Sequence, residues 1–244
     1  MPPPCIILRP MSRRVERVRV ASAKLAEFSA REVAAILRET VDRRDHASLC
    51  LAGGSTPRAT YLVLAELPDV PWSKVSVYFG DERCVPPDHA DSNFRMAEEA
   101  LLSRVRPKEV HRMHGELTDY DAAAQSYESV LPAAFDLLLL GLGEDAHTAS
   151  LFPGDAAAAE LTRRVVHVVG PKPPPNRLTI TPVLLQSAQN VLVLAAGAGK
   201  AEAVARALEA PLDTRAVPSQ WVRDAVWLMD HQAAGQLSGV LDPA

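Results

Sequence analysis

The sequence lacks the features that would place the chain in a membrane or on a nucleic acid. No apolar run approaches the roughly 18–20 residues that are needed to span a bilayer. Basic residues are not in excess either, because 26 Lys and Arg stand against 30 Asp and Glu and give the 244-residue chain a formal net charge of −4. Such a balance exerts no general attraction on nucleic acid or anionic lipid. We therefore expect a soluble globular protein with no nucleic-acid or membrane partner, in which any phosphate site is local.

Cysteine is scarce as well. The three cysteines, Cys5, Cys50 and Cys84, include no C-x-x-C pair. They are too few and too scattered for a disulfide framework or a zinc cage, which favours a reducing, cytoplasmic environment. Residues 1–8 are too short and too rich in proline for a signal peptide. Because Met11 offers a second start, we predict that residues 1–10 are a disordered extension or a start-site artefact, and that residues 11–244 form one α/β domain with at most a small extra lobe.

The remaining sequence alternates between strand and helix patterns. The apolar run that ends at Gly141 is typical of a central strand buried on both faces. Ser22 is the expected N-cap of the first helix. Predicted strands cover 15–20, 47–52, 75–79, 135–140, 164–169, 177–181, 190–196 and 225–229, and predicted helices cover 22–44, 57–67, 92–105, 118–130, 200–208, 217–222 and the surroundings of Val183 and His231. This order predicts an α/β fold with an open, mostly parallel sheet and helices on both faces.

Unusual residues gather where four of these strands end. The junctions are 52–57, 80–83, 141–147 and 197–200. Open α/β sheets bind ligands beyond the carboxyl ends of their strands, so these junctions are the expected site.

The first junction, with Gly53, Gly54, Ser55 and Thr56 before Pro57, suits an anion. Two glycines allow close backbone approach, Pro57 suits the first helical position, and free N–H groups at a helix start bind anions. A tight turn with an ordinary Ser or Thr cap is an equally good interpretation of this fragment alone.

Two cations are candidates to supplement that cradle. Arg177 opens a predicted strand and Lys200 begins a helix, and each would pass for a surface residue if seen alone. Lys200 does not belong to a P-loop, because Leu194 replaces the first glycine and Ala201 replaces the Ser or Thr that binds magnesium.

His147 lies in a glycine-flanked loop beside Glu144 and Asp145. A neutral imidazole oriented by a carboxylate can remove a proton from water, although a loop histidine that caps a turn is the plainer alternative. The glycines of this loop do not form a dinucleotide fingerprint, because Pro153-Gly154 interrupts the helix that should follow and no acidic residue ends the next strand. His111 and His114 lack a third ligand, and no G-x-S-x-G elbow occurs. We expect neither a cofactor nor a metal.

Taken together, the junctions resemble those of 6-phosphogluconolactonases. The resemblance covers the chain from about Met11 to its end. It is carried by 51–57 (LAGGSTP), 79–86 (FGDERCVP) with Ser92-Asn93-Phe94, 141–154 (GLGEDAHTASLFPG) and 174–179 (PPNRLT), in that order. It implies a Rossmann-like fold, shared with glucosamine-6-phosphate deaminases, and hydrolysis of 6-phospho-D-glucono-1,5-lactone in the oxidative pentose phosphate pathway.

The same resemblance implies the roles of the site residues. His147 would be the general base, with Asp81, Arg83 and Asp145 around it. Either Asp145 or Asp81 would orient the imidazole, and Arg83 or backbone N–H groups would stabilise the oxyanion. The phosphate would be held by Gly53, Gly54, Ser55, Thr56, Arg177 and Lys200. The partner would be a small sugar-phosphate lactone, and the protein is expected to be a monomer or a weak homodimer.

One residue departs from the family pattern. The family usually has glycine at the position of Ala146, and if this position needs a positive φ, alanine costs about 1 kcal/mol and can shift the imidazole. Two other functions stay open. A deaminase or isomerase would need a carboxylate soon after the histidine, which 149–152 does not supply. A non-catalytic sugar-phosphate sensor would keep the cradle without needing His147, and Ala146 favours it.

Overall fold

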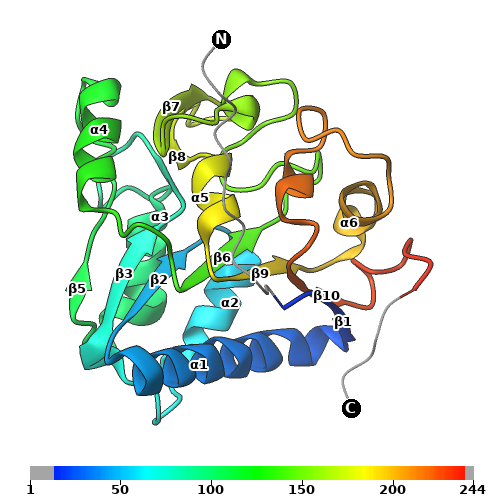
Figure 1. Cartoon of the computed structure of the whole chain (residues 1–244), viewed down its shortest axis with the longest axis horizontal. Helices are drawn as coiled ribbons and strands as arrows, with labels where there is room; N and C mark the ends of the chain where they lie inside the picture. Colours follow the sequence, from blue (N-terminus) through cyan, green and yellow to red (C-terminus); the bar gives the residue numbers. More distant parts are fainter. Residues whose placement is uncertain (1–13, 240–244) are drawn as a thin grey trace.

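A sheet of seven parallel strands organises the molecule (Figure 1). The computed structural model describes residues 14–239. The strand order across the sheet is β1-β10-β9-β6-β2-β3-β5, and every neighbouring pair runs parallel. The strands are β1 (Glu16–Val20), β2 (Ala47–Leu51), β3 (Val75–Phe79), β5 (Glu109–Val110), β6 (Leu137–Gly141), β9 (Asn190–Ala195) and β10 (Val226–Asp230). The predicted open parallel sheet is confirmed.

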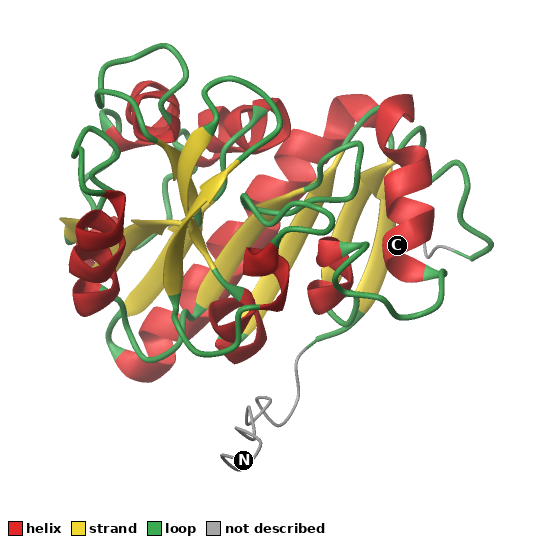
Figure 2. Cartoon of the chain, turned by 90° about the horizontal axis from the view of Figure 1, so that it is seen from above, coloured by secondary structure: helices red, strands yellow, loops and turns green. Residues whose placement is uncertain are grey.

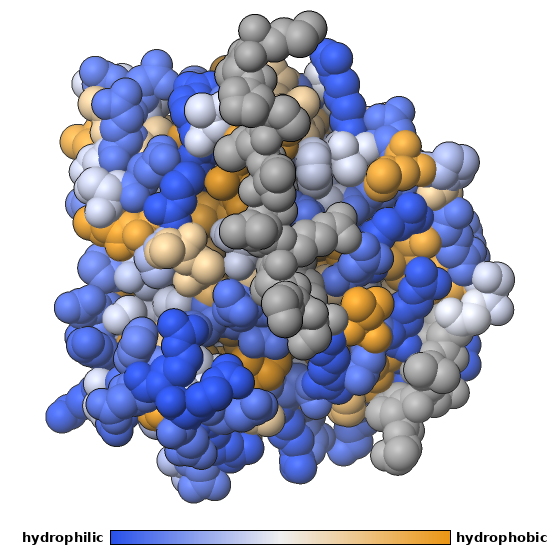
Figure 3. Space-filling view, in the orientation of Figure 1, coloured by the Kyte–Doolittle hydropathy of each residue, from blue (hydrophilic) through white to orange (hydrophobic). Residues whose placement is uncertain are grey.

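Helices cover both faces of this sheet (Figure 2). The helices are α1 (Leu25–Arg44), α2 (Ser55–Leu64), α3 (Asn93–Ala97), α4 (Tyr120–Val130), α5 (Pro182–Ser187) and α6 (Ala201–Leu208). Successive strand residues face opposite cores, as the period of a strand requires. Leu137 and Leu139 pack with α1 and α2, whereas Leu138 and Leu140 pack with α4, α5 and α6. The face viewed in Figure 3 is largely hydrophilic, with apolar residues in separate groups.

A second, antiparallel sheet projects from the carboxyl end of β3. It consists of β4 (Asp81–Arg83), β8 (Asn176–Ile180) and β7 (Val165–Val169), in the order β4-β8-β7. The sequence predicted β7 and β8 as strands but not their pairing with β4. A strand of three residues is too short to show a hydrophobic period, which is why β4 was not predicted.

Two local predictions outside the cleft are wrong. Ser22 does not cap the first helix: its Oγ donates to Asp230 Oδ2 at 2.8 Å, and residues 22–24 form a 3-10 turn before α1. The segment around His231 forms turns rather than a helix. The predicted extension over residues 1–10 lies outside the described residues. Within residues 14–239, no helix is both long and apolar enough to cross a bilayer.

The centre of the sheet is a topological switch point. β2 and β6 are neighbours, but the chain continues from β2 to β3 on one side and from β6 to β9 on the other. Connections that leave in opposite directions open a crevice at the carboxyl ends of such strands. The loops after β2 and β6 meet there, because a Cβ on Gly141 would lie 3.6 Å from the carbonyl oxygen of Gly53.

Two buried tyrosines secure the strand ends beside this crevice. The Tyr61 hydroxyl accepts from the N–H of Ala52 at 2.8 Å and donates to its carbonyl at 2.9 Å. The Tyr127 hydroxyl makes the same pair of bonds to Phe79, at 2.7 and 2.9 Å. Both satisfy backbone groups that would otherwise be buried without partners.

We expect Tyr61→Phe to destabilise the fold. The substitution leaves the N–H and C=O of Ala52 unpaired in the core, which costs about 1–3 kcal/mol of unfolding free energy. Urea denaturation monitored by circular dichroism measures the change. Tyr120→Phe is the matched control, because that side chain is only partly buried and stacks on His167. Equal midpoints for both variants would refute the role of the Tyr61 hydroxyl.

Candidate active site

A pocket of about 220 Å³ lies over the crevice between β2 and β6. Of the predicted site residues, it is lined by Gly53, Gly54, Ser55, Thr56, Asp81, Arg83, His147, Arg177 and Lys200. Asp145 lines an adjoining pocket of about 460 Å³, which shares Gly143, His147, Arg177 and Lys200 with the first. The chain therefore brings residues from five separate segments, including strands β4 and β8, together in one cleft.

The loop after β2 presents free backbone donors to the pocket. Gly54 adopts a φ of 105°, which favours glycine, and precedes the first residue of α2. Helix α2 begins at Ser55, so Pro57 is its third residue rather than its first as predicted. No side chain caps this end. The N–H groups of Ser55 and Thr56 are thus available, and the interpretation as an ordinary Ser or Thr cap does not fit.

His147 is held by Asp145. The Nδ1 atom lies 2.6 Å from Asp145 Oδ1, and the same oxygen accepts from the backbone N–H of His147 at 3.1 Å. The hydrogen bond from His147 lowers the pKa of Asp145 from 3.8 to about 2. Gly143 permits this arrangement, since a Cβ there would lie 2.1 Å from Nδ1 and 2.5 Å from Asp145 Oδ1.

Ala146, the residue that departs from the family pattern, has a positive φ, and alanine is strained in this conformation. Ala146 is fully buried and has a φ of 70°. Alanine in this left-handed region costs about 1 kcal/mol relative to glycine, while its buried methyl group recovers about as much. The hydrogen bond between His147 and Asp145 is intact in its presence.

Two arginines lie side by side at the edge of the pocket. Arg83 on β4 pairs with Arg177 on β8, and Arg177 is 8% exposed. Arg177 donates to the carbonyls of Pro174 at 3.3 Å and Lys172 at 3.4 Å. Arg83 donates to the carbonyl of Asp91 at 2.5 Å, and its Nε has no partner within the described chain. Burial and the nearby Arg83 lower the pKa of Arg177 against the pull of Asp81.

Arg177 is buried, whereas Arg83 and Lys200 are partly exposed, and none of the three has a carboxylate partner among the described residues. Within residues 14–239, neither arginine forms an ion pair, and Lys200 Nζ has no hydrogen-bond or ion-pair partner. Buried charges in proteins are normally paired. An anionic ligand in the pocket would supply the missing charge.

Asp81 does not contact the imidazole. Its carboxylate accepts from Ser150 Oγ at 2.7 Å and from Asn93 Nδ2 at 3.1 Å. Of the two carboxylates considered for orienting His147, Asp145 is therefore the one in contact. The neighbouring Glu82 is buried and accepts from the N–H groups of Asn93 and Phe94 at 2.7 and 2.8 Å, which ties β4 to the start of α3.

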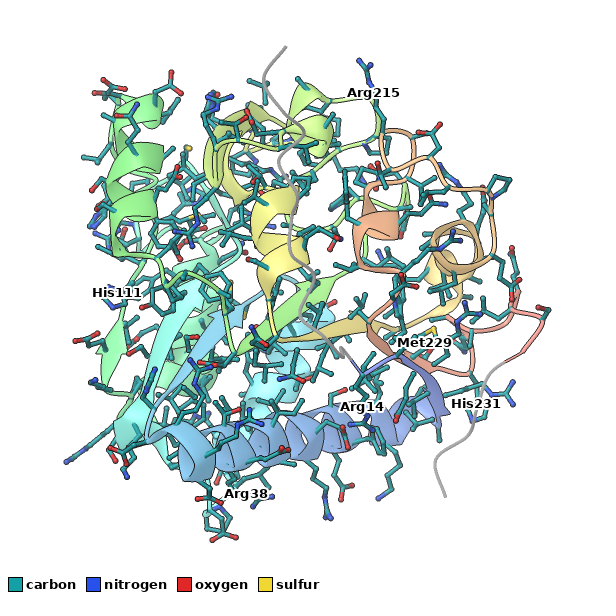
Figure 4. The ribbon with its side chains drawn as sticks, viewed as in Figure 1. Arg14, Arg38, His111, Arg215, Met229 and His231 are labelled. Carbon is teal, nitrogen blue, oxygen red and sulfur yellow. The ribbon has the colours of Figure 1, made fainter. Side chains whose placement is uncertain are left out.

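Sequence reasoning missed three residues of this site. Asn93 and Ser150 hold Asp81, and the Phe152 ring lies 5.0 Å from the His147 ring. All three stand inside the motifs that carry the family resemblance, which was the available signal. The described residues contain no cluster of three or more side chains suited to a metal. His111 lies at the β5 edge of the sheet, where it stacks on Tyr78 (Figure 4).

Sequence comparisons match the chain to one family of known proteins. A family model described as glucosamine-6-phosphate isomerases/6-phosphogluconolactonase matches residues 21–229. The chain is 38% identical to a 6-phosphogluconolactonase of Synechocystis over 82% of this chain and 89% of that one. It is 39% identical to that of Mycobacterium tuberculosis over 81% and 87%.

Solved structures agree with these sequence matches. The 6-phosphogluconolactonase of Trypanosoma brucei superposes with a TM-score of 0.80 and 30% identity, covering 94% of this chain and all of that one. A monomeric glucosamine-6-phosphate deaminase superposes with a TM-score of 0.78 at 23% identity over 91% of this chain and all of that one, which shows a shared fold.

We expect the low pKa of Asp145 to depend on His147. Since its pKa in the folded chain lies below the ordinary value, the ionised carboxylate contributes stability above about pH 4, and this contribution is lost as the pH falls toward 2. In His147→Ala the Asp145 pKa should rise toward 3.8, measured by carbon-13 NMR of the carboxyl group. Glu116, whose pKa Arg112 holds at about 2, is the internal control and should not move. An unchanged Asp145 titration in the variant would contradict the assignment.

Proposed function

The chain belongs to the family of glucosamine-6-phosphate isomerases and 6-phosphogluconolactonases, and we propose that it hydrolyses 6-phospho-D-glucono-1,5-lactone to 6-phospho-D-gluconate, the lactonase step of the oxidative pentose phosphate pathway. Relatives at 38–39% identity carry the lactonase name. The observation that carries the proposal is the presence of a carboxylate-bound histidine and three unpaired cations around one cleft. A phosphorylated lactone has one anionic end and one electrophilic end, which match these two features.

His147 would act as general base. With Nδ1–H donated to Asp145, the lone pair on Nε2 is free to remove a proton from water. The resulting hydroxide attacks the lactone carbonyl carbon. General base catalysis of this kind contributes about 10²- to 10⁴-fold to the rate. When the tetrahedral intermediate collapses, the ring oxygen leaves and takes the proton back from the imidazolium.

Charge on the carbonyl oxygen needs a positive or N–H partner. Arg83 and the backbone N–H groups of the loop after β6 are the candidates that line the pocket. A δ-lactone is an activated ester, so the reaction needs neither a covalent nucleophile nor a metal. A base and an oriented oxyanion donor are sufficient.

The phosphate would lie at the start of α2. Ser55 and Thr56, whose N–H groups and hydroxyls can donate to a phosphate, line the pocket together with Arg177 and Lys200. Binding the phosphate fixes the far end of the sugar, so that the carbonyl is presented to the base in a single orientation.

A deaminase of the same fold fits the residues less well. Ring opening and enolisation need a further acid–base group, and residues 149–152 contain no carboxylate. The ring of Phe152 lies against the imidazole instead. A non-catalytic sensor would have no need for the hydrogen bond between Asp145 and His147, which is present despite Ala146.

We expect His147→Ala to lower kcat for the lactone by about 10²- to 10⁴-fold without unfolding the protein. The rate is read from acid release by freshly generated lactone, with the spontaneous rate subtracted. His111→Ala is the matched control, because this histidine lies outside the cleft. Full activity in His147→Ala would eliminate the base assignment. Ammonia release from glucosamine 6-phosphate by the wild type would favour the deaminase, and binding without hydrolysis would favour the sensor.

We expect Arg177→Met to act at the phosphate end. Loss of a charge-assisted hydrogen bond should raise KM for the phosphorylated lactone by roughly 10- to 100-fold. Unphosphorylated D-glucono-1,5-lactone should show little change, because it has no group for Arg177 to bind. Arg38→Met, on the exposed side of α1, is the control. An equal effect on both substrates would argue against a phosphate contact.

A further inference from the structure

We propose that Phe152 is a positioning residue that sets the separation between the base and the phosphate-binding arginine. The inference rests on the proposed function, since it assigns a role within the same cleft. Phe152 is 6% exposed, and its ring touches both groups. The ring centroid lies 5.0 Å from that of His147, and the guanidinium carbon of Arg177 lies 5.4 Å from the same centroid.

The contact with His147 completes the restraint on the imidazole. The hydrogen bond to Asp145 fixes Nδ1 but leaves the ring free to tilt about that bond. Phe152 packs against the imidazole at an interplanar angle of 52°, and this contact removes that freedom. The direction of Nε2, which would receive the proton of water, then depends on both neighbours.

The contact with Arg177 has a different character. Arg177 is buried, and its two hydrogen bonds within the described residues are long, at 3.3 and 3.4 Å to carbonyl oxygens. A guanidinium over an aromatic face is attracted by the negative charge density of the ring. Phe152 therefore supplies an attraction that holds the guanidinium in the cleft without neutralising its charge for an anion.

Gly170 packs closely against both Phe152 and Arg177. A Cβ at this position would lie 2.9 Å from Cε2 and Cζ of Phe152 and 3.1 Å from Nε of Arg177. Its φ is not in the left-handed region, so alanine would strain the contacts rather than the backbone. Gly170 also donates to the carbonyl of Pro175 at 2.7 Å, which closes the loop whose carbonyls accept from Arg177.

Phe152 thus contacts both of the groups that would bind opposite ends of the substrate. A sugar phosphate has a fixed length, and both ends must fit together for the carbonyl to meet the base. Replacing the ring should move the imidazole and the guanidinium at once. The first change lowers kcat, and the second raises KM for the phosphorylated substrate.

The test is Phe152→Leu, assayed with the phosphorylated and the unphosphorylated lactone. We expect kcat to fall about 10-fold on both substrates, and KM to rise about 5-fold on the phosphorylated lactone alone. Gly170→Ala, whose Cβ would press on the same ring and on Arg177 Nε, should give the same pattern. The pKa of Asp145 should rise from about 2 in both variants, as its bond to His147 loosens, and NMR measures this change independently of activity.

Two controls separate positioning from a general loss of packing. Phe135→Leu removes a buried ring of the same core before the amino end of β6, away from the cleft, and should lower stability without changing kcat or KM. Gly239→Ala meets no atom within 4 Å and should change nothing. Folded Phe152→Leu with wild-type constants, or with an equal rise in KM on both substrates, would overturn the inference. A wild type that hydrolyses neither lactone would instead refute the proposed function, and the Asp145 titration would still decide the role of Phe152.

Discussion

The hydrogen bond between Asp145 and His147 imposes its geometry on the whole loop after β6. A contact of 2.6 Å between residues two apart forces the chain to fold back on itself, and the N–H of Gly143 donates to the carbonyl of His147 at 2.8 Å to close the turn. Gly143 must lack a side chain, and Ala146 must take a left-handed backbone. The strain stored at Ala146 is of the kind that persists where the surrounding structure fixes a functional side chain.

The acidic and basic side chains of the cleft differ in whether they have partners. The carboxylates are each bonded to a neighbour, Asp145 to His147 and Asp81 to Ser150 and Asn93, whereas Arg83, Arg177 and Lys200 have no carboxylate partner within residues 14–239. The unpaired charge of the buried Arg177 costs stability in the free protein, and the proposed anionic substrate would compensate this cost. A fold selected for stability alone would pair these cations with the available acids.

Much of the architecture was predictable because buried strands and amphipathic helices leave periodic patterns. The central strand before Gly141 and the loops at 52–57 and 141–147 were identified from such patterns and from glycine placement. Features that depend on long-range pairing were not. The three-residue strand β4 forms only because it pairs with β8, which lies almost a hundred residues later in the sequence. Asp81 and Asp145 were equivalent candidates to orient His147. The sequence does not show that Asp81 accepts a hydrogen bond from Ser150 instead, whereas Asp145 contacts the imidazole. Ser22 failed as a cap for the same reason, since Asp230 is its partner in space.

Tyr61 has a consequence for how the cleft receives a ligand. This residue belongs to α2, yet its hydroxyl is bonded to Ala52 directly after β2, so residues 52–61 form a closed loop that includes Gly53, Gly54 and the first residues of the helix. A loop tied at both ends in this way is ordered before any ligand arrives. The loop would therefore lose little conformational entropy on binding the proposed phosphate group, and the empty and occupied loops should superimpose closely. The binding free energy of the proposed substrate at this end of the cleft would then hold the sugar in place rather than order the protein around it.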